Sequence, residues 1–146
     1  MSTMIPGPNN ELITASVAPA YGPTANTAQV TASSVYVSSS YSFPYAIISA
    51  SITTNGNPVF LACSGDANPI SVNGLGTLQL YRDSTAIGSR IQYEGSAANE
   101  NNPYCLTYID SQPAGTYTYY LKSVSQSGHT QFGEVSGPSL SIAELR

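Results

Sequence analysis

The chain has 146 residues, with 8 acidic and 4 basic side chains and a net charge of −4. This length suits a single domain with one hydrophobic core. Four basic residues cannot neutralise many phosphates, which excludes nucleic acid and anionic membrane surfaces as partners. Charged residues make up only 8% of the chain, against roughly 25% in average soluble proteins, so we expect a surface of uncharged polar groups.

Residues 1–27 differ from the rest of the chain, because they hold four of the ten prolines and a single charged residue. Proline favours extended backbone and cannot donate to a sheet ladder. We therefore predict an extended N-terminal arm that binds a partner, with a docked or disordered terminus as the alternatives. Its apolar residues are the expected anchors: Ile5, Leu12, Ile13, Val17 and Tyr21. The segment lacks the basic and apolar regions of a secretory signal, and no apolar run in the chain approaches the ~20 residues of a membrane helix.

From residue 28 onward the pattern is that of short strands separated by Gly, Pro and Asn turns, without a helical period. Eight strands in one domain predict an all-β fold, a single antiparallel β-sandwich of jelly-roll type over residues 28–146. An immunoglobulin-like sandwich is the alternative. The expected strands cover residues 29–37, 46–54, 59–64, 77–82, 86–94, 104–110, 115–124 and 139–145.

The two cysteines, Cys63 and Cys105, both stand in apolar, strand-like segments. Free cysteine is among the most buried residue types, so this context predicts two buried thiols. A disulfide between two neighbouring strands is the alternative. Two cysteines form neither a disulfide framework nor a zinc site of the usual spacing.

No pattern of residues indicates catalysis. His129 is the only histidine, it stands in a turn-like and therefore exposed stretch, and no Gly-x-Ser-x-Gly elbow accompanies it. The spacing of the carboxylates selects no acid–base pair. Turn chemistry explains the oxygen-rich stretches at Asp66 and Asn68 and at residues 99–102 without calcium. We expect local backbone amides to bind Asp83 and Asp110. The sequence therefore predicts a protein that is not an enzyme and needs no metal or cofactor.

Three segments resemble known proteins. Residues 113–121, Pro-Ala-Gly-Thr-Tyr-Thr-Tyr-Tyr-Leu, resemble the penultimate strand of the trimeric jelly rolls related to complement heads and tumour necrosis factor. Residues 139–146 resemble the last strand of the same family. Residues 76–83, with Ile87 and Gly88 after them, are similar to segments in minor capsid, decoration and fibre-head proteins of large DNA viruses and phages.

The resemblance implies a structural virion protein that docks on other capsid proteins through its N-terminal arm and the surface of its β-sandwich. It also implies a homotrimer, with aromatic residues of the strand 115–124 near the threefold axis and Tyr117 and Tyr119 in contact with the partner. Alternatively, these tyrosines are ordinary strand residues, because tyrosine has a high β preference. The alternative function is a receptor- or glycan-binding fibre head, for which residues 99–104 form the candidate loop.

Overall fold

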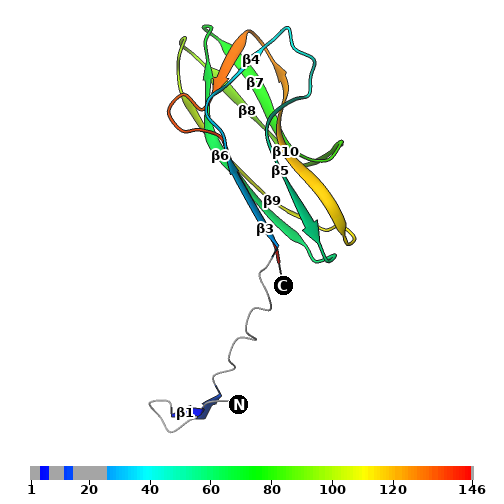
Figure 1. The fold of residues 1–146 in the computed structure, drawn as a ribbon. Helices are drawn as coiled ribbons and strands as arrows, with labels where there is room; N and C mark the ends of the chain where they lie inside the picture. Colours follow the sequence, from blue (N-terminus) through cyan, green and yellow to red (C-terminus); the bar gives the residue numbers. More distant parts are fainter. Residues whose placement is uncertain (1–3, 7–11, 15–25, 146) are drawn as a thin grey trace.

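The computed structural model describes residues 26–145 and two short strands before them, β1 (Met4–Pro6) and β2 (Leu12–Thr14) (Figure 1). These two strands pair antiparallel, with Ile5 opposite Ile13. Strand pairing was not expected in a segment so rich in proline. The side chains of the predicted anchors Ile5, Leu12 and Ile13, and the whole of Val17 and Tyr21, lie outside the described residues.

The described part of the chain from residue 26 is all-β, as predicted, and contains no helix, so no helix there could span a membrane. Its strands form two antiparallel sheets packed face to face (Figure 1). They are β3 (Thr27–Thr31), β4 (Val35–Ser38), β5 (Tyr45–Thr54), β6 (Val59–Pro69), β7 (Gly74–Arg82), β8 (Thr85–Gly95), β9 (Asn102–Asp110), β10 (Gly115–Gln126), β11 (His129–Phe132) and β12 (Ser139–Glu144).

The order of the strands is that of a jelly roll. One sheet runs β5-β10-β7-β8. In the other sheet, the long β6 pairs with β9 along one edge, and with β12 and then β11 along the other. The outermost strands there are β3 beside β12 and β4 beside β11. With β3–β4 and β11–β12 each counted as one interrupted strand, the sheets run 1-8-3-6 and 2-7-4-5, the crossed order of two Greek keys.

The two interrupted strands break at the same place, which the sequence did not reveal. A single strand was expected over residues 29–37, but β3 ends at Thr31 and β4 begins at Val35. The amide of Ala32 donates to the carbonyl oxygen of Pro138, in the loop between β11 and β12. A Cβ atom on Gly137 would lie 2.4 Å from the carbonyl oxygen of Ala32. Only glycine therefore allows the two chain segments to approach each other so closely.

Two other sequence predictions of local structure were wrong. Residues 64–69 were expected to form a turn, but β6 continues to Pro69. His129 was expected in a turn, but it begins β11, and β11 was not predicted at all. In both cases tertiary contacts hold the segment in an extended conformation. Asp66 of β6 accepts hydrogen bonds from amides of the loop after β11, and Thr130 of β11 accepts one from the hydroxyl of Tyr93. Local propensity is a weak guide where such contacts override it.

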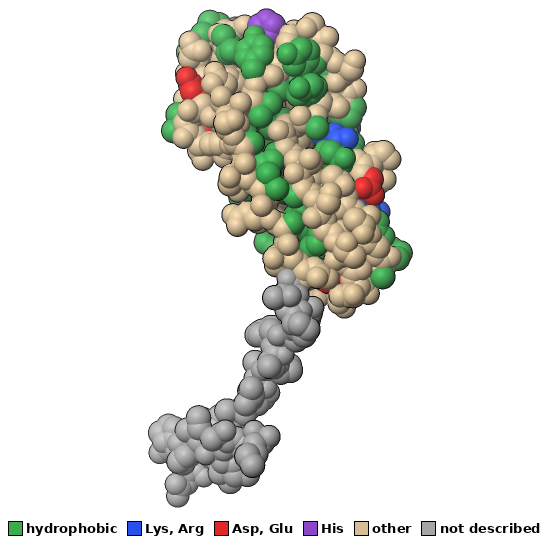
Figure 2. Space-filling model, in the orientation of Figure 1, with side chains coloured by type: hydrophobic (Ala, Val, Ile, Leu, Met, Phe, Trp, Pro, Cys, Tyr) green, Lys and Arg blue, Asp and Glu red, His purple; other side chains and the backbone are tan. Residues whose placement is uncertain are grey.

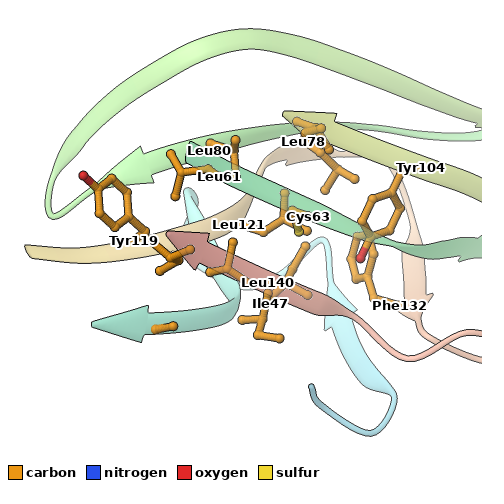
Figure 3. Packing of buried hydrophobic residues seen from close by; sticks show 14 of the residues in the cluster. Ile47, Leu61, Cys63, Leu78, Leu80, Tyr104, Tyr119, Leu121, Phe132 and Leu140 are labelled. Atoms are coloured by element: carbon orange, nitrogen blue, oxygen red, sulfur yellow. The ribbon is translucent and has the colours of Figure 1, made fainter. Parts of the chain in front are cut away.

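The core is an apolar layer between the sheets, and Figure 3 shows its side chains pointing toward one another. Leu121 and Leu78 come from one sheet and Leu61 and Leu140 from the other, and all four are completely buried. Tyr119 is also completely buried. The predicted role of Tyr119 as a partner-binding residue is therefore wrong for this fold, because its side chain is enclosed within the protomer.

The cysteines lie on adjacent strands but face opposite sides of their sheet. Cys63 points into the core from β6, whereas Cys105 on β9 is exposed, and both are free. The prediction of two buried thiols is thus correct for Cys63 and wrong for Cys105. The residue opposite Cys63 is Leu106, not Cys105, so the one-residue offset turns the two side chains apart. Burial, and to a lesser extent the nearby Cys105, raise the pKa of the Cys63 thiol to about 12.

One end of the sandwich is fastened by Glu144, the last residue of β12, which is only 2% exposed. Its carboxylate accepts hydrogen bonds from the backbone amides of Asn55 and Asn57, at 2.6 and 3.3 Å, and from the side-chain amide of Asn26, at 2.8 Å. Burial alone would raise the pKa of Glu144, but the hydrogen bonds from Asn55, Asn26 and Asn57 outweigh it and hold the pKa below its usual value.

We expect the two thiols to differ in reactivity. In the folded protein an aromatic disulfide reagent should modify Cys105 rapidly, because the thiol is exposed, and should leave Cys63 untouched, because its thiol is buried and not ionised at neutral pH. Mass spectrometry after partial labelling measures the modification of each cysteine. Adding denaturant should make the Cys63 thiol accessible to the reagent. Equal labelling rates in the folded state would contradict this placement.

Glu144 should make stability depend on pH. Because its folded-state pKa is lowered, its contribution is complete above the unfolded pKa of about 4.3 and is lost as pH falls from there through the folded value. Glu144→Gln should therefore be less stable than the parent chain at pH 7, and the difference should shrink below about pH 4.3, as measured by urea unfolding. Glu94→Gln is the control, since that side chain is exposed. A difference independent of pH would refute this role.

Candidate binding surfaces

The outer faces of the two sheets differ in charge. Charged side chains are sparse on the side of the molecule shown in Figure 2, where uncharged polar and hydrophobic groups predominate. Three of the eight acidic residues, Asp66, Asp110 and Glu144, are buried and face neither outer surface. Few charged side chains therefore remain for the outer faces, and the two faces differ in how many they carry.

The first surface is the outer face of the sheet that contains β6, and we call it the uncharged face. Strand register places twelve residues in three rows across β3, β12, β6 and β9. None is Asp, Glu, Lys, Arg or His, and Phe60 and Ile109 stand side by side, 37% and 55% exposed. The rows are Thr27, Ala143, Phe60 and Ile109; Gln29, Ser141, Ala62 and Thr107; and Thr31, Ser139, Ser64 and Cys105.

The uncharged face has a shallow hollow beside Phe60. The hollow has a volume of about 320 Å³ and is lined by residues of β3, β12 and β6. Its lining includes Ala28, Ile142 and Ala143 but no charged side chain. A second hollow, of about 250 Å³, opens between the edge strands β8 and β9, and its lining includes Leu80, Ile91 and Leu106.

The second surface is the outer face of the opposite sheet, and we call its centre the cationic cluster: Gln79, Tyr81, Arg90, Tyr120 and Lys122. The ammonium nitrogen of Lys122 lies 4.5 Å from the ring centroid of Tyr120 and 4.6 Å from that of Tyr81. Arg90 Nε donates to Gln79 Oε1 at 2.9 Å, and Gln79 stands opposite Lys122 on the neighbouring strand. The cluster therefore spans β10, β7 and β8.

The predicted partner-binding tyrosines belong to a separate network at the end of β10. Arg82 binds both carboxylate oxygens of Asp110, at 3.0 and 2.8 Å, and the hydroxyl of Tyr119 donates to Asp110 Oδ2 at 2.8 Å. The prediction that a backbone amide binds Asp110 was therefore wrong. Tyr117 is half-buried, lies beneath the guanidinium of Arg82 and donates its hydroxyl to the carbonyl oxygen of Pro113. Contact between Tyr117 and a partner remains a prediction.

The stretch considered for calcium has a structural role in this fold. Asp66 accepts hydrogen bonds from the backbone amides of Glu134 and Val135, each at 3.2 Å, and from that of Ser136. Asn68 donates its side-chain amide to Glu134. Asp83 accepts from the backbone amide of Thr118 at 2.9 Å, and this confirms the expected amide contact. Among the described residues, no three His, Cys, Asp or Glu side chains gather to hold a metal ion.

His129 is exposed, as predicted, and stacks on Tyr36 with 5.5 Å between the ring centroids. In β11 it stands opposite Ser38 of β4, and no cluster of three His, Cys, Asp or Glu side chains forms around it among the described residues. The raised pKa of Cys63 also keeps that thiol protonated at neutral pH.

The loop considered for glycan binding lacks its expected aromatic residue. Glu100 accepts from the backbone amides of Ser96 and Ala97 and from the hydroxyl of Ser96, which lower the pKa of its carboxyl and close the turn on itself. Tyr104 points into the core and is 6% exposed. No exposed ring is therefore available in residues 99–104 to stack on a sugar.

Sequence reasoning missed both outer faces, because each is created by strand pairing. The uncharged face joins residues from position 27 to position 143, and the cationic cluster joins positions 79 to 122. The only signal in the sequence was composition: so few charges must leave large areas of surface without any. Which strands would carry those areas depends on the sheet order.

Comparison with known proteins identifies a fold but no family. The sequence matches no model of a protein family and no curated protein. Among solved structures, the sugar-binding C-terminal domain of EclA is similar, with 17% identity and a TM-score of 0.51 over 94% of this chain and 88% of that one. Eiger TNF from S. frugiperda is 13% identical, with a TM-score of 0.48 over 84% of this chain and 91% of that one.

A viral structure is also among the matches. The infectious bursal disease virus Gx strain structure is 17% identical, with a TM-score of 0.39 over 80% of this chain and 28% of that one. All three identities are low enough that the likeness concerns the fold alone. The chain is an all-β jelly roll by its strand order, and its fold is similar to that of the sugar-binding EclA domain.

Proposed function

We propose that the protein is a structural, non-enzymatic component of a virion that docks on other capsid proteins. The observation that carries this proposal is the uncharged face, where twelve surface positions on four strands include no ionised side chain. Burying an unpaired charge in an interface costs far more than burying a hydroxyl or methyl group. A face without charges is therefore suited to contact with another protein, and Phe60 and Ile109 supply apolar contact area at one of its edges.

The size of the face indicates that a second contact is needed. Four strands about 4.8 Å apart and five residues at about 3.3 Å each give about 300 Å². Stable protein interfaces bury roughly 800 Å² on each partner. The proposal therefore includes the N-terminal arm as the second contact, with Ile5, Leu12, Ile13, Val17 and Tyr21 as its anchors. Each anchor would contribute about 1.5–3 kcal/mol before the cost of ordering the chain.

The alternative function, a receptor- or glycan-binding fibre head, loses its candidate loop, because Tyr104 is buried. The cationic cluster is the surface that favours a ligand-binding activity in its place. The two functions are compatible, because the uncharged face and the cationic cluster lie on opposite sheets of the sandwich.

Placing one charge on the uncharged face should impair docking. Thr107→Arg puts a guanidinium on the exposed side of β9 and should weaken incorporation into particles about tenfold or more, since burying an unpaired charge costs over about 1.4 kcal/mol. Gln92→Arg adds the same charge to the opposite sheet and should incorporate normally. Quantitative immunoblots of purified particles, made with each tagged chain, measure the difference. Normal incorporation of Thr107→Arg would show that this face does not dock.

The contribution of the arm can be tested by deleting residues 1–25. The deletion should stop before Asn26, which binds Glu144, and before β3, which begins at Thr27. We expect a folded β domain, with unchanged circular dichroism, that no longer enters particles. Entry at the normal level would show that the sandwich carries the whole docking surface.

We also propose that the protein is a homotrimer, since closed assembly would cover exposed apolar side chains such as Ile109 and Val135. Light scattering of the full chain at neutral pH should give three times the chain mass of 15.3 kDa. A mass of one chain at high concentration would indicate that a monomer docks instead.

A further inference from the structure

The outer face of the β5-β10-β7-β8 sheet holds two cations without carboxylate partners. Lys122 on β10 and Arg90 on β8 flank Gln79 on β7, which stands opposite Lys122 and accepts the hydrogen bond from Arg90. Neighbouring strands are about 4.8 Å apart, so the two positions lie about 10 Å from each other across the sheet. Within the part of the chain that the structure describes, the one ion pair joins Arg82 to Asp110.

Other contacts hold both cationic groups in place without neutralising them. The ammonium of Lys122 lies against the rings of Tyr81 and Tyr120, whose quadrupoles attract a cation but carry no net charge. No acceptor among the described residues takes a hydrogen bond from that ammonium. The guanidinium of Arg90 uses only Nε, on Gln79, while Gln79 in turn donates to the carbonyl oxygen of Gly88. Both terminal nitrogens of Arg90 therefore remain available to a ligand.

The nearest acidic residues on these strands are distant. Glu94 follows Arg90 by four residues on β8, which is about 13 Å along a strand. Asp83 accepts a hydrogen bond at Oδ1 from the backbone amide of Thr118, which precedes Lys122 by four residues on β10, again about 13 Å along a strand. Two cations thus stand together on a protein whose net charge is −4. The expected occupant of such a position is an anionic group.

The residues around the cationic cluster indicate which kind of molecule bears the anionic group. On the adjacent β5 and β10, exposed hydroxyls form cross-strand pairs, Ser51 with Thr118 at 2.8 Å and Thr53 with Thr116 at 2.9 Å. The ring of Tyr120 is half-buried and borders this row. Hydroxyls that can both donate and accept, beside an aromatic side chain and a cationic pair, match a sugar ring that bears an acidic substituent.

We propose that the cationic cluster binds an acidic saccharide, with the carboxylate or sulfate held between Arg90 and Lys122 and the sugar ring beside Tyr120, along the row of hydroxyls on β5 and β10. Arg90 would bind two oxygens of the anion through its terminal nitrogens, and Lys122 would bind as a point charge. A polyanion that needs many cations, such as nucleic acid, does not fit a site with two. The inference is independent of the assembly role, because it concerns the opposite sheet, which stays accessible when the uncharged face is docked.

Calorimetric titration of the full chain at low salt tests the proposal. The probes are tetragalacturonate, a chondroitin sulfate tetrasaccharide, the neutral maltotetraose, sodium sulfate and a tetraglutamate peptide. At least one acidic saccharide should bind, with weaker binding at high salt, whereas the other three probes should not bind measurably. Tetragalacturonate and the sulfated probe distinguish a carboxylate from a sulfate as the group that is recognised.

Variants then assign the binding to the cluster. Lys122→Gln and Arg90→Gln should each weaken binding of the acidic saccharide about tenfold, because each removes a charge-assisted hydrogen bond. Asn101→Asp lowers the net charge by the same amount at an exposed position between β8 and β9, outside both surfaces, and should bind as the parent does. Lys122→Arg should retain binding. If Lys122→Gln alters the fold, Arg90→Gln decides the question, because its side chain is exposed on an edge strand.

Three results would overturn the proposal. The first is that neither acidic saccharide binds. The second is that Asn101→Asp weakens binding as much as Arg90→Gln, which would indicate a general charge effect. The third is that tetraglutamate or sulfate binds as tightly as the saccharides, which would show that the cluster recognises an acidic peptide or a simple anion. Each of these leaves the docking role of the uncharged face to its own test, because particle incorporation is measured separately.

Discussion

The apolar layer between the two sheets is the constraint on which the rest of this structure depends. Each strand alternates between the layer and an outer face, so the side chains that fill the core also determine which residues reach the surface. Tyr119 illustrates this coupling: its ring completes the layer, and so it is unavailable to any partner. Its neighbour Tyr120 faces outward for the same reason and contributes to the cationic cluster.

The buried carboxylates show how a chain with few charges uses them. Asp66 orders the loop between β11 and β12, Asp110 joins β9 to Arg82 and Tyr119, and Glu144 joins the end of β12 to the β5–β6 turn. Only Asp110 has a cationic partner, and the other two rely on amide donors. Each of these carboxylates joins segments that are distant in the chain, so the three residues hold loops and strand ends in place.

The outer faces of the two sheets favour different kinds of contact. One face presents hydroxyls and apolar groups without charge, which favours contact with protein. The other holds Arg90 and Lys122 in fixed positions without counter-charges, which favours an anionic ligand.

The sequence by itself determined the all-β class, most of the strands, the exposure of His129 and the burial of Cys63, because alternation and turn residues are local signals. Tertiary structure alone decided that β6 runs on through Asp66 and Asn68, since loop amides and Glu134 satisfy side chains that would otherwise favour a turn. It also decided that Cys105 is exposed and that the residues of each outer face meet. The register between strands that are distant in the chain fixes those contacts, and a single sequence carries no local signal of that register.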